Sequence, residues 1–321
     1  MSTQENSRKR KMDNVEDQEA KRPNIETTKF IQYSVLFSEL RHHILTYCKG
    51  PTLFNYAQCS KICNSEIQQL NTVPPKDLII LEESDGVMVV LRYSPIRKIK
   101  RKFLFSEFEN VMEEVLKYLE KCYKYVKERT SEIILDFKIW PTELIKWKHI
   151  AKIERWDVTI YKSMYDDFRE YFENSSHISQ LTLYNCTDVS DQVTIQSDFF
   201  RSEVFQNLEA AYLFVKCNID SDDFINLQNP YLHLNAPVHF HDIRAKVRKW
   251  NCKRQLRSNF LFIEFSDNDD MRISDIFPTD QFEVVRILGD DNHEKFRIGR
   301  VIAQLENIEH GKLLHLLIER D

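Results

Sequence analysis

Short apolar runs that predict β-strands alternate with segments of helical periodicity from residue 131 onward. The predicted strands are Glu132–Phe137, Trp156–Tyr161, Gln180–Cys186, Ala211–Cys217, Tyr231–Asn235, Phe260–Phe265 and Phe282–Leu288. The predicted helices between them are Thr142–Ile150, Met164–Phe172, Asp198–Phe205 and Asp242–Trp250. This alternation indicates an α/β fold made of successive strand–helix units.

The strand–helix units recur at irregular intervals. Successive strand anchors are separated by 25, 23, 31, 20 and 29 residues: Leu135, Ile160, Leu183, Phe214, Leu234 and Ile263. Units of 20–30 residues are typical of stacked leucine-rich-like repeats, although the LxxLxLxxN signature occurs cleanly only around Ile178–Asn185. We therefore predict that residues 131–321 form a degenerate leucine-rich-repeat-like α/β domain, with an irregular α/β sandwich as the alternative.

Residues 76–130 are predicted to link this domain to the N-terminal part by a hairpin and a helix. Asp77–Leu81 and Val87–Tyr93 indicate the two strands of the hairpin. The strongly basic segment Arg97–Lys102 is predicted to be a loop. Ser106 and Glu109 fit a capping box that opens a helix. The apolar seam of this helix, which is expected to pack on the adjacent sheet, consists of Phe108, Met112, Val115, Leu119, Cys122 and Val126.

Residues 34–75 are predicted to form three short helices. The first carries Leu40, Ile44 and Cys48 on one face, and Gly50-Pro51 separates it from a second helix over Leu53–Cys59. Ser60 is the predicted N-cap of the third helix. Residues this few cannot bury their own apolar surface, so we expect them to require a partner or the following domain.

Residues 1–28 are polar and highly charged, and we predict a disordered tail. The tail holds two basic clusters separated by nine residues: Arg8, Lys9, Arg10 and Lys11, then Lys21 and Arg22. An extended tail can place two such clusters in the acidic grooves of a nuclear import receptor. A solvated charge run is the alternative, because six basic and six acidic residues cancel in this tail.

Composition excludes several classes of function. Glycine occurs five times in 321 residues, and the closest two are ten residues apart, so the chain holds no GxGxxG or GxxxxGK[ST] loop for a nucleotide phosphate. The net charge of −5 gives no general attraction to nucleic acid. No apolar run approaches the roughly 20 residues that span a bilayer. Seven scattered cysteines suit reduced thiols, and we expect a cytoplasmic or nuclear protein.

Candidate catalytic and metal-binding groups are few. His239 and His241 would share one face of a strand, but a metal needs further ligands, and ordinary histidines before a helix are the preferred interpretation. A zinc site would have to come from His42, His43, Cys48, Cys59 and Cys63. The spacing of the last two differs from the usual CxxC. We therefore expect no catalytic residue, no metal and no cofactor, and predict that the protein is not an enzyme.

Nucleic-acid binding is also disfavoured. Trp140, Trp147, Trp156 and Trp250 fall at apolar-face positions, where burial in the core explains them better than stacking on bases. Arg97–Lys102 lacks the interleaved aromatic residues of a strand-binding groove. Nucleic acid and membranes are therefore not expected as partners.

Residues 36–70 resemble an F-box. The paired aliphatic residues Ile44-Leu45 and the Leu-x6-Ser-Lys stretch from Leu53 to Lys61 carry the resemblance, while Leu36-Phe37 stands where Leu-Pro is usual. The resemblance implies docking on a Skp-type adaptor of a cullin-RING ubiquitin ligase. The implied adaptor-binding residues are Phe37, Leu40, Ile44, Leu45, Leu53, Phe54, Tyr56 and Ala57.

The C-terminal half is similar to the F-box-associated domain of nematode F-box families. Three segments carry this similarity in the family's order: the strand at Leu213, the helix from Asp242-Ile243 to Trp250, and the strand Phe260–Phe265. By this resemblance the distal domain selects a target protein. The predicted function is the substrate-recognition subunit of an SCF-type ubiquitin ligase. The alternative is a non-ligase, leucine-rich-like interaction scaffold whose N-terminal helices cap the repeats.

Overall fold

The computed structural model describes residues 44–45, 47–48, 50–61, 63–64, 74–124, 126, 130–252, 259–266, 271–287, 294–308 and 311–318. The predicted tail with its nuclear signal lies outside these residues, as do Phe37 and Leu40 of the predicted adaptor-binding set.

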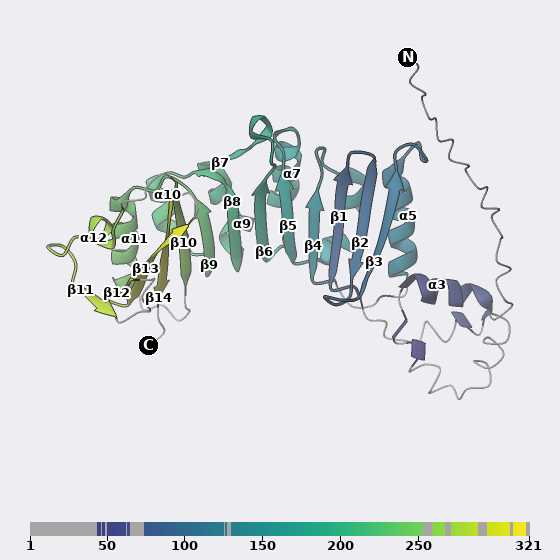
Figure 1. Cartoon of the computed structure of the whole chain (residues 1–321), viewed down its shortest axis with the longest axis horizontal. Coiled ribbons are helices and arrows are strands. Elements are labelled where there is room, and N and C mark those ends of the chain that lie inside the picture. The colour runs from purple at the N-terminus through teal and green to yellow at the C-terminus, as the bar shows by residue number, and fades with distance from the viewer. Residues whose placement is uncertain are drawn as a thin grey trace, which may run out of the picture.

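The described residues form a mixed α/β structure around one large sheet (Figure 1). Its strands are β1 (Asp77–Glu83), β2 (Gly86–Arg92), β3 (Lys98–Leu104), β4 (Glu132–Asp136), β5 (Arg155–Ile160), β6 (Gln180–Asn185), β7 (Thr194–Gln196), β8 (Ala210–Asn218), β9 (Tyr231–Asn235), β10 (Phe260–Ser266), β11 (Val284–Ile287), β12 (Glu294–Ile298), β13 (Val301–Ile308) and β14 (Gly311–Ile318). Their order across the sheet is β11-β12-β13-β14-β10-β9-β8-β6-β5-β4-β1-β2-β3, and β7 pairs with β8.

The middle of the sheet is parallel and both of its sides are antiparallel. Strands β1, β4, β5, β6, β8, β9 and β10 pair in parallel with their neighbours. From β4 to β10 their spatial order follows the chain, as expected for strand–helix units placed one after another. On one side β2 and β3 continue the sheet in antiparallel fashion, and on the other side β14, β13, β12 and β11 do so.

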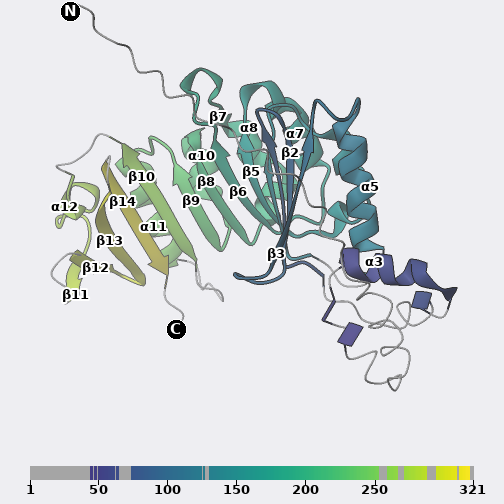
Figure 2. The ribbon, with the colours of Figure 1, turned by 45° about the vertical axis from the view of Figure 1, so that its right-hand side comes forward.

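Helices cover one face of the sheet and lie behind the strands in Figure 1. They include α5 (Val111–Tyr123), α6 (Thr142–Ile145), α7 (Tyr165–Glu173), α8 (Ser197–Arg201), α9 (Glu203–Asn207), α10 (Ser221–Asn226), α11 (Phe240–Cys252) and α12 (Ile273–Ile276). Short 3-10 helices, η1 (Ile150–Lys152), η2 (Lys162–Met164) and η3 (Val189–Asp191), lie in the connections, and η3 buries no residue. Helix α3 (Gly50–Cys59) lies beside one end of α5 in both views (Figures 1 and 2). None of the described helices is long and apolar enough to span a bilayer.

The core lies between the sheet and these helices. Alternate residues of each parallel strand point into it; Leu181 and Leu183 of β6, for example, are completely buried. The facing helices contribute aromatic rings, and Phe168, Phe172, Phe199 and Phe205 are all fully buried. All four tryptophans are buried, which confirms that the core explains them.

Buried polar side chains donate hydrogen bonds to backbone carbonyl groups in the turns between successive strand–helix units. Lys246 of α11 is 1% exposed, and its ammonium group donates hydrogen bonds of 2.8 and 2.9 Å to the carbonyl groups of Phe224 and Leu227 at the end of α10. Asn229 likewise donates to the carbonyl groups of Phe205 and Leu208, at 2.7 and 3.2 Å. Because an unpaired buried carbonyl is costly, these two side chains fix the loops that precede β8 and β9.

The segment Arg97–Lys102 is predicted from the sequence to be a loop, but most of it belongs to strand β3. Its inward positions Ile99 and Phe103 contact the core, whereas Lys98 and Lys100 are exposed. The guanidinium of Arg101 lies 4.9 Å from the ring centroids of both Phe103 and Tyr118, a cation–π arrangement. The basic residues are therefore those of an edge strand, where lysine prevents pairing with another sheet.

The predicted capping box at Ser106 and Glu109 is also wrong. Residues 105–107 form a turn, and α5 begins at Val111 with Asn110 as its N-cap. The Asn110 side chain accepts a hydrogen bond of 3.1 Å from the backbone N–H of Glu113, and asparagine is as strong an N-cap as serine. The seam itself is confirmed, since Val115, Leu119 and Cys122 are buried against the sheet.

The prediction that Phe214 is the anchor of its strand is wrong. Phe214 is 39% exposed, whereas its neighbours Leu213 and Val215 are completely buried. The other predicted anchors, Leu135, Ile160, Leu183, Leu234 and Ile263, are all buried. Phe214 therefore belongs to the face of the sheet opposite the helices.

Candidate binding face and adjoining cavity

The face of the sheet opposite the helices is not covered by any described element (Figures 1 and 2). The strand register gives this open face its order. Thr159, Tyr184 and Phe214 are direct neighbours on β5, β6 and β8, and Asp157, Thr182 and Tyr212 form the next row. Each row continues across the parallel strands, so residues far apart in the chain form continuous stripes.

One stripe of the open face is aromatic. The rings of Tyr184 and Phe214 stack with centroids 5.1 Å apart at an angle of 6°. The ring of Phe214 contacts that of His233 edge-on, with centroids 4.7 Å apart. The ring centroid of Phe262 lies 6.0 Å from that of His233 and 4.8 Å from that of His315. We call these five residues the aromatic row. Tyr184 and Phe214 are 42% and 39% exposed, and adjacent exposed rings mark interaction surfaces.

The aromatic row is missing from the sequence-based expectations, because it depends on which side of each strand faces the helices. The signal that could have found it is the alternation of side chains along each strand, since every second residue points to the same face. Leu181 and Leu183 occupy the inward positions of β6, which places Tyr184 outward, and Leu213 and Val215 do the same for Phe214 on β8. Aromatic residues at outward positions of two neighbouring strands are therefore readable once the inward set is fixed.

Next to the aromatic row lies a group of carboxylates. Glu132 and Asp157 are half-buried on β4 and β5, and we call them the acidic pair. Burial, together with the charges of Asp157 and Asp77, raises the pKa of Glu132, and burial is the main cause of the raised pKa of Asp157. Asp77, which is 3% exposed, forms an ion pair with Arg92 at 3.1 Å. The exposed side chain of Arg155 lowers the pKa of both members of the acidic pair.

The raised pKa of Glu132 implies that its negative charge opposes folding at neutral pH. The folded state holds the proton of Glu132 more tightly than the unfolded state does. The free energy of unfolding is therefore highest below the pKa that Glu132 has in the unfolded chain, and it falls as pH rises through the pKa of Glu132 in the folded chain. We expect Glu132→Gln to raise the midpoint of thermal unfolding at pH 7.5 by about 0.5 °C, the effect of a few tenths of a kcal/mol in a chain of this size. Thermal scans of both proteins at several pH values measure this.

The pH dependence provides the control. Near pH 3.5 the carboxyl group is protonated in both states, so the gain from Glu132→Gln should vanish there. The variant Glu143→Gln on α6 changes the same charge at an exposed position on the helical side, and it should have no comparable effect. A loss of stability in Glu132→Gln at pH 7.5 would show that the carboxylate stabilises the fold.

A cavity of about 690 Å³ opens at the carboxyl ends of β8, β9 and β10. It is lined by Thr194, Lys216, Cys217, Asn218, Asn235, Ala236, Pro237, Val238, His239, Phe240, Glu264 and Phe265. The strand register places Lys216 next to Asn235 and Asn235 next to Glu264. The side chain of Glu264 lies 4.0 Å from the imidazole of His233 in the aromatic row, so the cavity adjoins the open face.

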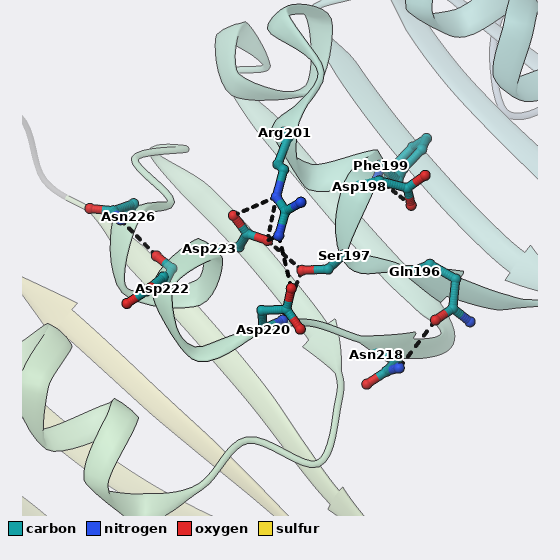
Figure 3. Close-up of polar contacts among 10 residues, drawn as sticks. All are labelled: Gln196, Ser197, Asp198, Phe199, Arg201, Asn218, Asp220, Asp222, Asp223 and Asn226. Carbon is teal, nitrogen blue, oxygen red and sulfur yellow. Dashed lines mark hydrogen bonds and ion pairs between the residues drawn. The ribbon is translucent and has the colours of Figure 1, made fainter.

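Polar contacts join the neighbouring loops beside Asn218, one of the residues that line the cavity (Figure 3). Asn218 donates to the side chain of Gln196 at 3.1 Å, which ties the end of β8 to the end of β7. Arg201 of α8 forms ion pairs with Asp220 and Asp223, both at 2.8 Å. The hydroxyl of Ser197 donates to Asp223 and accepts from the backbone N–H of Asp220. The loops on either side of β8 are therefore held as one unit.

The two candidate histidines lie side by side in the structure but have different polar surroundings. His239 lines the cavity, whereas His241 lies in the first turn of α11 and pairs with Asp242 at 2.9 Å. Their rings stack with centroids 5.5 Å apart. Among the described residues, no group of three or more His, Cys, Asp or Glu side chains could hold a metal ion. Burial raises the pKa of the Cys217 thiol to about 12, so this cavity residue is protonated and unreactive at neutral pH.

The N-terminal helical segment has a small apolar cluster of its own. Leu45, Leu53 and Ala57 are buried in it, and Cys48 and Tyr56 pack against them. Ile44 is 39% exposed and Tyr47 is 64% exposed. The backbone carbonyl of Tyr47 accepts a hydrogen bond from the guanidinium of Arg97. The side chain of Phe54 lies outside the described residues.

The predicted adaptor-binding residues thus fall into two groups. Leu45, Leu53 and Ala57 are covered within the chain, and Ile44 faces solvent. Helix α3 contains the predicted second helix but begins three residues earlier, at Gly50, within the predicted break. Ser60 accepts a hydrogen bond of 3.1 Å from the backbone N–H of Cys63, which is the geometry of the predicted N-cap.

Comparisons with known proteins identify no relative of this chain. No family model, no curated protein and no solved structure matches it.

Proposed function

We propose that this chain is a non-catalytic substrate receptor of a cullin-RING ubiquitin ligase. In this proposal a degenerate leucine-rich-repeat-like domain binds a target protein through its open sheet face, and the N-terminal helices dock on a Skp-type adaptor. The observation that carries the proposal is the exposed aromatic row, with Tyr184 stacked on Phe214 on a face that no described element covers. Such rings bury large apolar areas when a partner binds.

A receptor of this kind needs no chemistry of its own. It promotes transfer of ubiquitin by holding the target close to the charged carrier, which raises the effective concentration of the target lysines. The cavity next to the row fits a binding role, since burial holds its thiol, that of Cys217, in the protonated form.

The adaptor half of the proposal is supported by the F-box-like residues and by their placement. Ile44 and Tyr47 are exposed next to one another at the start of the helical segment. The buried residues Leu45, Leu53 and Ala57 hold the segment together. We therefore assign adaptor contact to the exposed side, with Ile44 as its best-placed residue.

One observation favours a scaffold without a ligase partner. Helix α3 packs beside α5, and Arg97 binds the carbonyl of Tyr47, so the helical segment is attached to the first strands of the sheet. A segment attached in this way could serve as the cap of the strand array.

Binding of a purified Skp-type adaptor to the full-length chain tests the proposal. We expect a 1:1 complex by size-exclusion chromatography, and we expect Ile44→Asp to weaken it at least about tenfold, because a carboxylate would be desolvated in an apolar interface. Thr52→Asp is the matched control, since Thr52 is exposed on α3 and is not among the F-box-like contact residues. Absence of a complex with the folded wild type would favour the scaffold. Equal loss in both variants would contradict the assignment of Ile44.

A further inference from the structure

The aromatic row and the acidic pair form one continuous surface. Tyr184 lies at their junction: burial and then the charges of Asp157 and Glu132 raise the pKa of its phenol. The register places Asp157 on the strand next to Tyr184, two positions away, and Glu132 on the strand after that. An apolar platform formed by Tyr184 and Phe214 thus lies beside Asp157 on the open face, with Glu132 one strand further away.

Negative charge predominates in this part of the open face. The outward carboxylates along β1, β4 and β5 are those of Asp77, Glu83, Glu132, Asp136 and Asp157, and Glu83 pairs with Lys102 of β3 at 2.6 Å. Arg92 is engaged by Asp77 at 3.1 Å, and Asp136 accepts a hydrogen bond of 2.8 Å from the hydroxyl of Tyr161. Arg155 is the neighbouring cation that acts on both members of the acidic pair. One arginine does not balance two half-buried carboxylates, so the surface is complementary to an added cation.

The register sets the distance between the two features. Asp157 lies opposite Thr182, so Tyr184 is one strand across and two residues further along. With about 4.8 Å between strands and about 3.3 Å per residue, the two Cα atoms are about 8 Å apart. A peptide spans this distance with two residues as a β-strand, about 6.7 Å, or three residues as polyproline II, about 9 Å. Both conformations leave the peptide extended over the sheet.

We propose that the open face recognises an extended segment of the target in which a lysine or arginine lies two or three positions from an aromatic or long aliphatic residue. The cation sits between Glu132 and Asp157, and the apolar side chain lies on the Tyr184–Phe214 platform. This inference rests on the proposed receptor function and adds the chemistry of the target.

The two contacts act together. Burial and then the charges of Asp157 and Asp77 raise the pKa of Glu132, and a bound cation would offset this repulsion. The platform presents two nearly parallel rings, 5.1 Å apart at their centroids, whose exposed surfaces become dry on binding. A segment with only one of the two residues forfeits one contact, so both residues are required for selection.

Selection from a display library of random 12-residue peptides on the immobilised full-length chain tests the inference. We expect enrichment of sequences with Lys or Arg two or three positions from Phe, Tyr, Trp, Leu or Met. A synthetic peptide carrying the enriched motif should bind about tenfold more weakly when its cation is replaced by glutamine, as measured by fluorescence anisotropy.

Two variants and a control locate the contacts. In the double variant Glu132→Gln with Asp157→Asn the cation preference should disappear while the aromatic preference remains. In Tyr184→Ala the aromatic preference should disappear. Glu143→Gln, on the helical side of the sheet, should select the same peptides as the wild type. Unfolding is not expected to confound the first variant, because Glu132→Gln is predicted to stabilise the fold at neutral pH.

The outcomes separate this inference from the proposed function. Aromatic peptides that depend on Tyr184 but show no cation preference would overturn the inference and leave target binding at the open face intact. Enrichment of acidic residues, or a cation preference unaffected by the double variant, would overturn the inference alone. Absence of any peptide that distinguishes wild type from Tyr184→Ala would overturn both the inference and target binding at this face. The adaptor experiment is independent of all of them.

Discussion

Replacing Trp156 with alanine is expected to lower the free energy of unfolding by about 3–5 kcal/mol, the range measured for large aromatic residues in cores. Trp156 is completely buried on β5, and its ring lies 5.3 Å from that of Tyr171 on α7 and 6.0 Å from that of His177. Its indole N–H donates a hydrogen bond of 2.8 Å to the carbonyl of Ile153. The substitution therefore leaves both a cavity and an unpaired buried carbonyl.

Urea unfolding followed by circular dichroism measures this loss. Tyr184→Ala removes an aromatic ring from the neighbouring strand β6, but at an exposed position on the other face, and should cost much less. Trp156→Phe should give an intermediate loss, since it retains most of the ring volume without the donor. Similar losses for Trp156→Ala and Tyr184→Ala would contradict the assignment of the core to the helical side.

The second large effect is expected at Gly86, where β2 begins. A Cβ atom at this position would lie 2.1 Å from the carbonyl oxygen of Phe103 on β3. Backbone atoms cannot turn away as a side chain can, so the β2–β3 pairing must shift. We expect Gly86→Ala to destabilise the fold by about 2–3 kcal/mol, as overpacking of a well-ordered site does.

The neighbouring turn supplies a matched control for Gly86. Ser84 is exposed in the same hairpin turn, and Ser84→Ala should change the unfolding free energy by less than about 0.5 kcal/mol. Comparison of both variants with the wild type in urea separates the effect of the Cβ atom from that of altering the turn. A near-neutral Gly86→Ala would mean that the hairpin accommodates the methyl group, and that this close approach is not required.

The sequence predicts the middle of the sheet well because the strands there alternate strictly. In β4 and β5 the inward positions are apolar and the outward positions are mostly polar, so both the strand and its buried side can be read. In β8 the run from Tyr212 to Val215 is apolar or aromatic at both parities. The pattern then shows a strand but not which side of it faces the helices, which is why the sequence alone gives Phe214 as the strand anchor.

The strands outside the parallel region are harder to predict. Strand β14 is apolar on both sides and reads as a short buried segment. Its pairing with β10, in which Phe260 lies opposite Leu317, joins residues more than fifty positions apart. In strand β3 the basic residues outnumber the two inward apolar residues, Ile99 and Phe103, so the sequence shows no clear strand pattern. Both cases depend on tertiary contacts rather than on local propensity.

The candidate binding face cannot be predicted from the sequence pattern for a related reason. Glu132, Asp157, Tyr184 and Phe214 come from four strands spread over about eighty residues, and only the parallel register makes them neighbours. Each residue taken alone is an ordinary outward strand position. The histidines His239 and His241 attracted attention in the sequence because they are close along the chain, yet the structure directs one to the cavity and pairs the other with Asp242.

The antiparallel strands at both sides of the sheet limit how this protein could lengthen. A strand–helix unit needs a parallel neighbour, but β3 ends one side with exposed lysines and β11 ends the other with only four residues. Both edges therefore disfavour pairing with a further strand or with a second copy. A duplicated unit between β4 and β10 would instead lengthen the open face and leave the antiparallel strands at both sides in place.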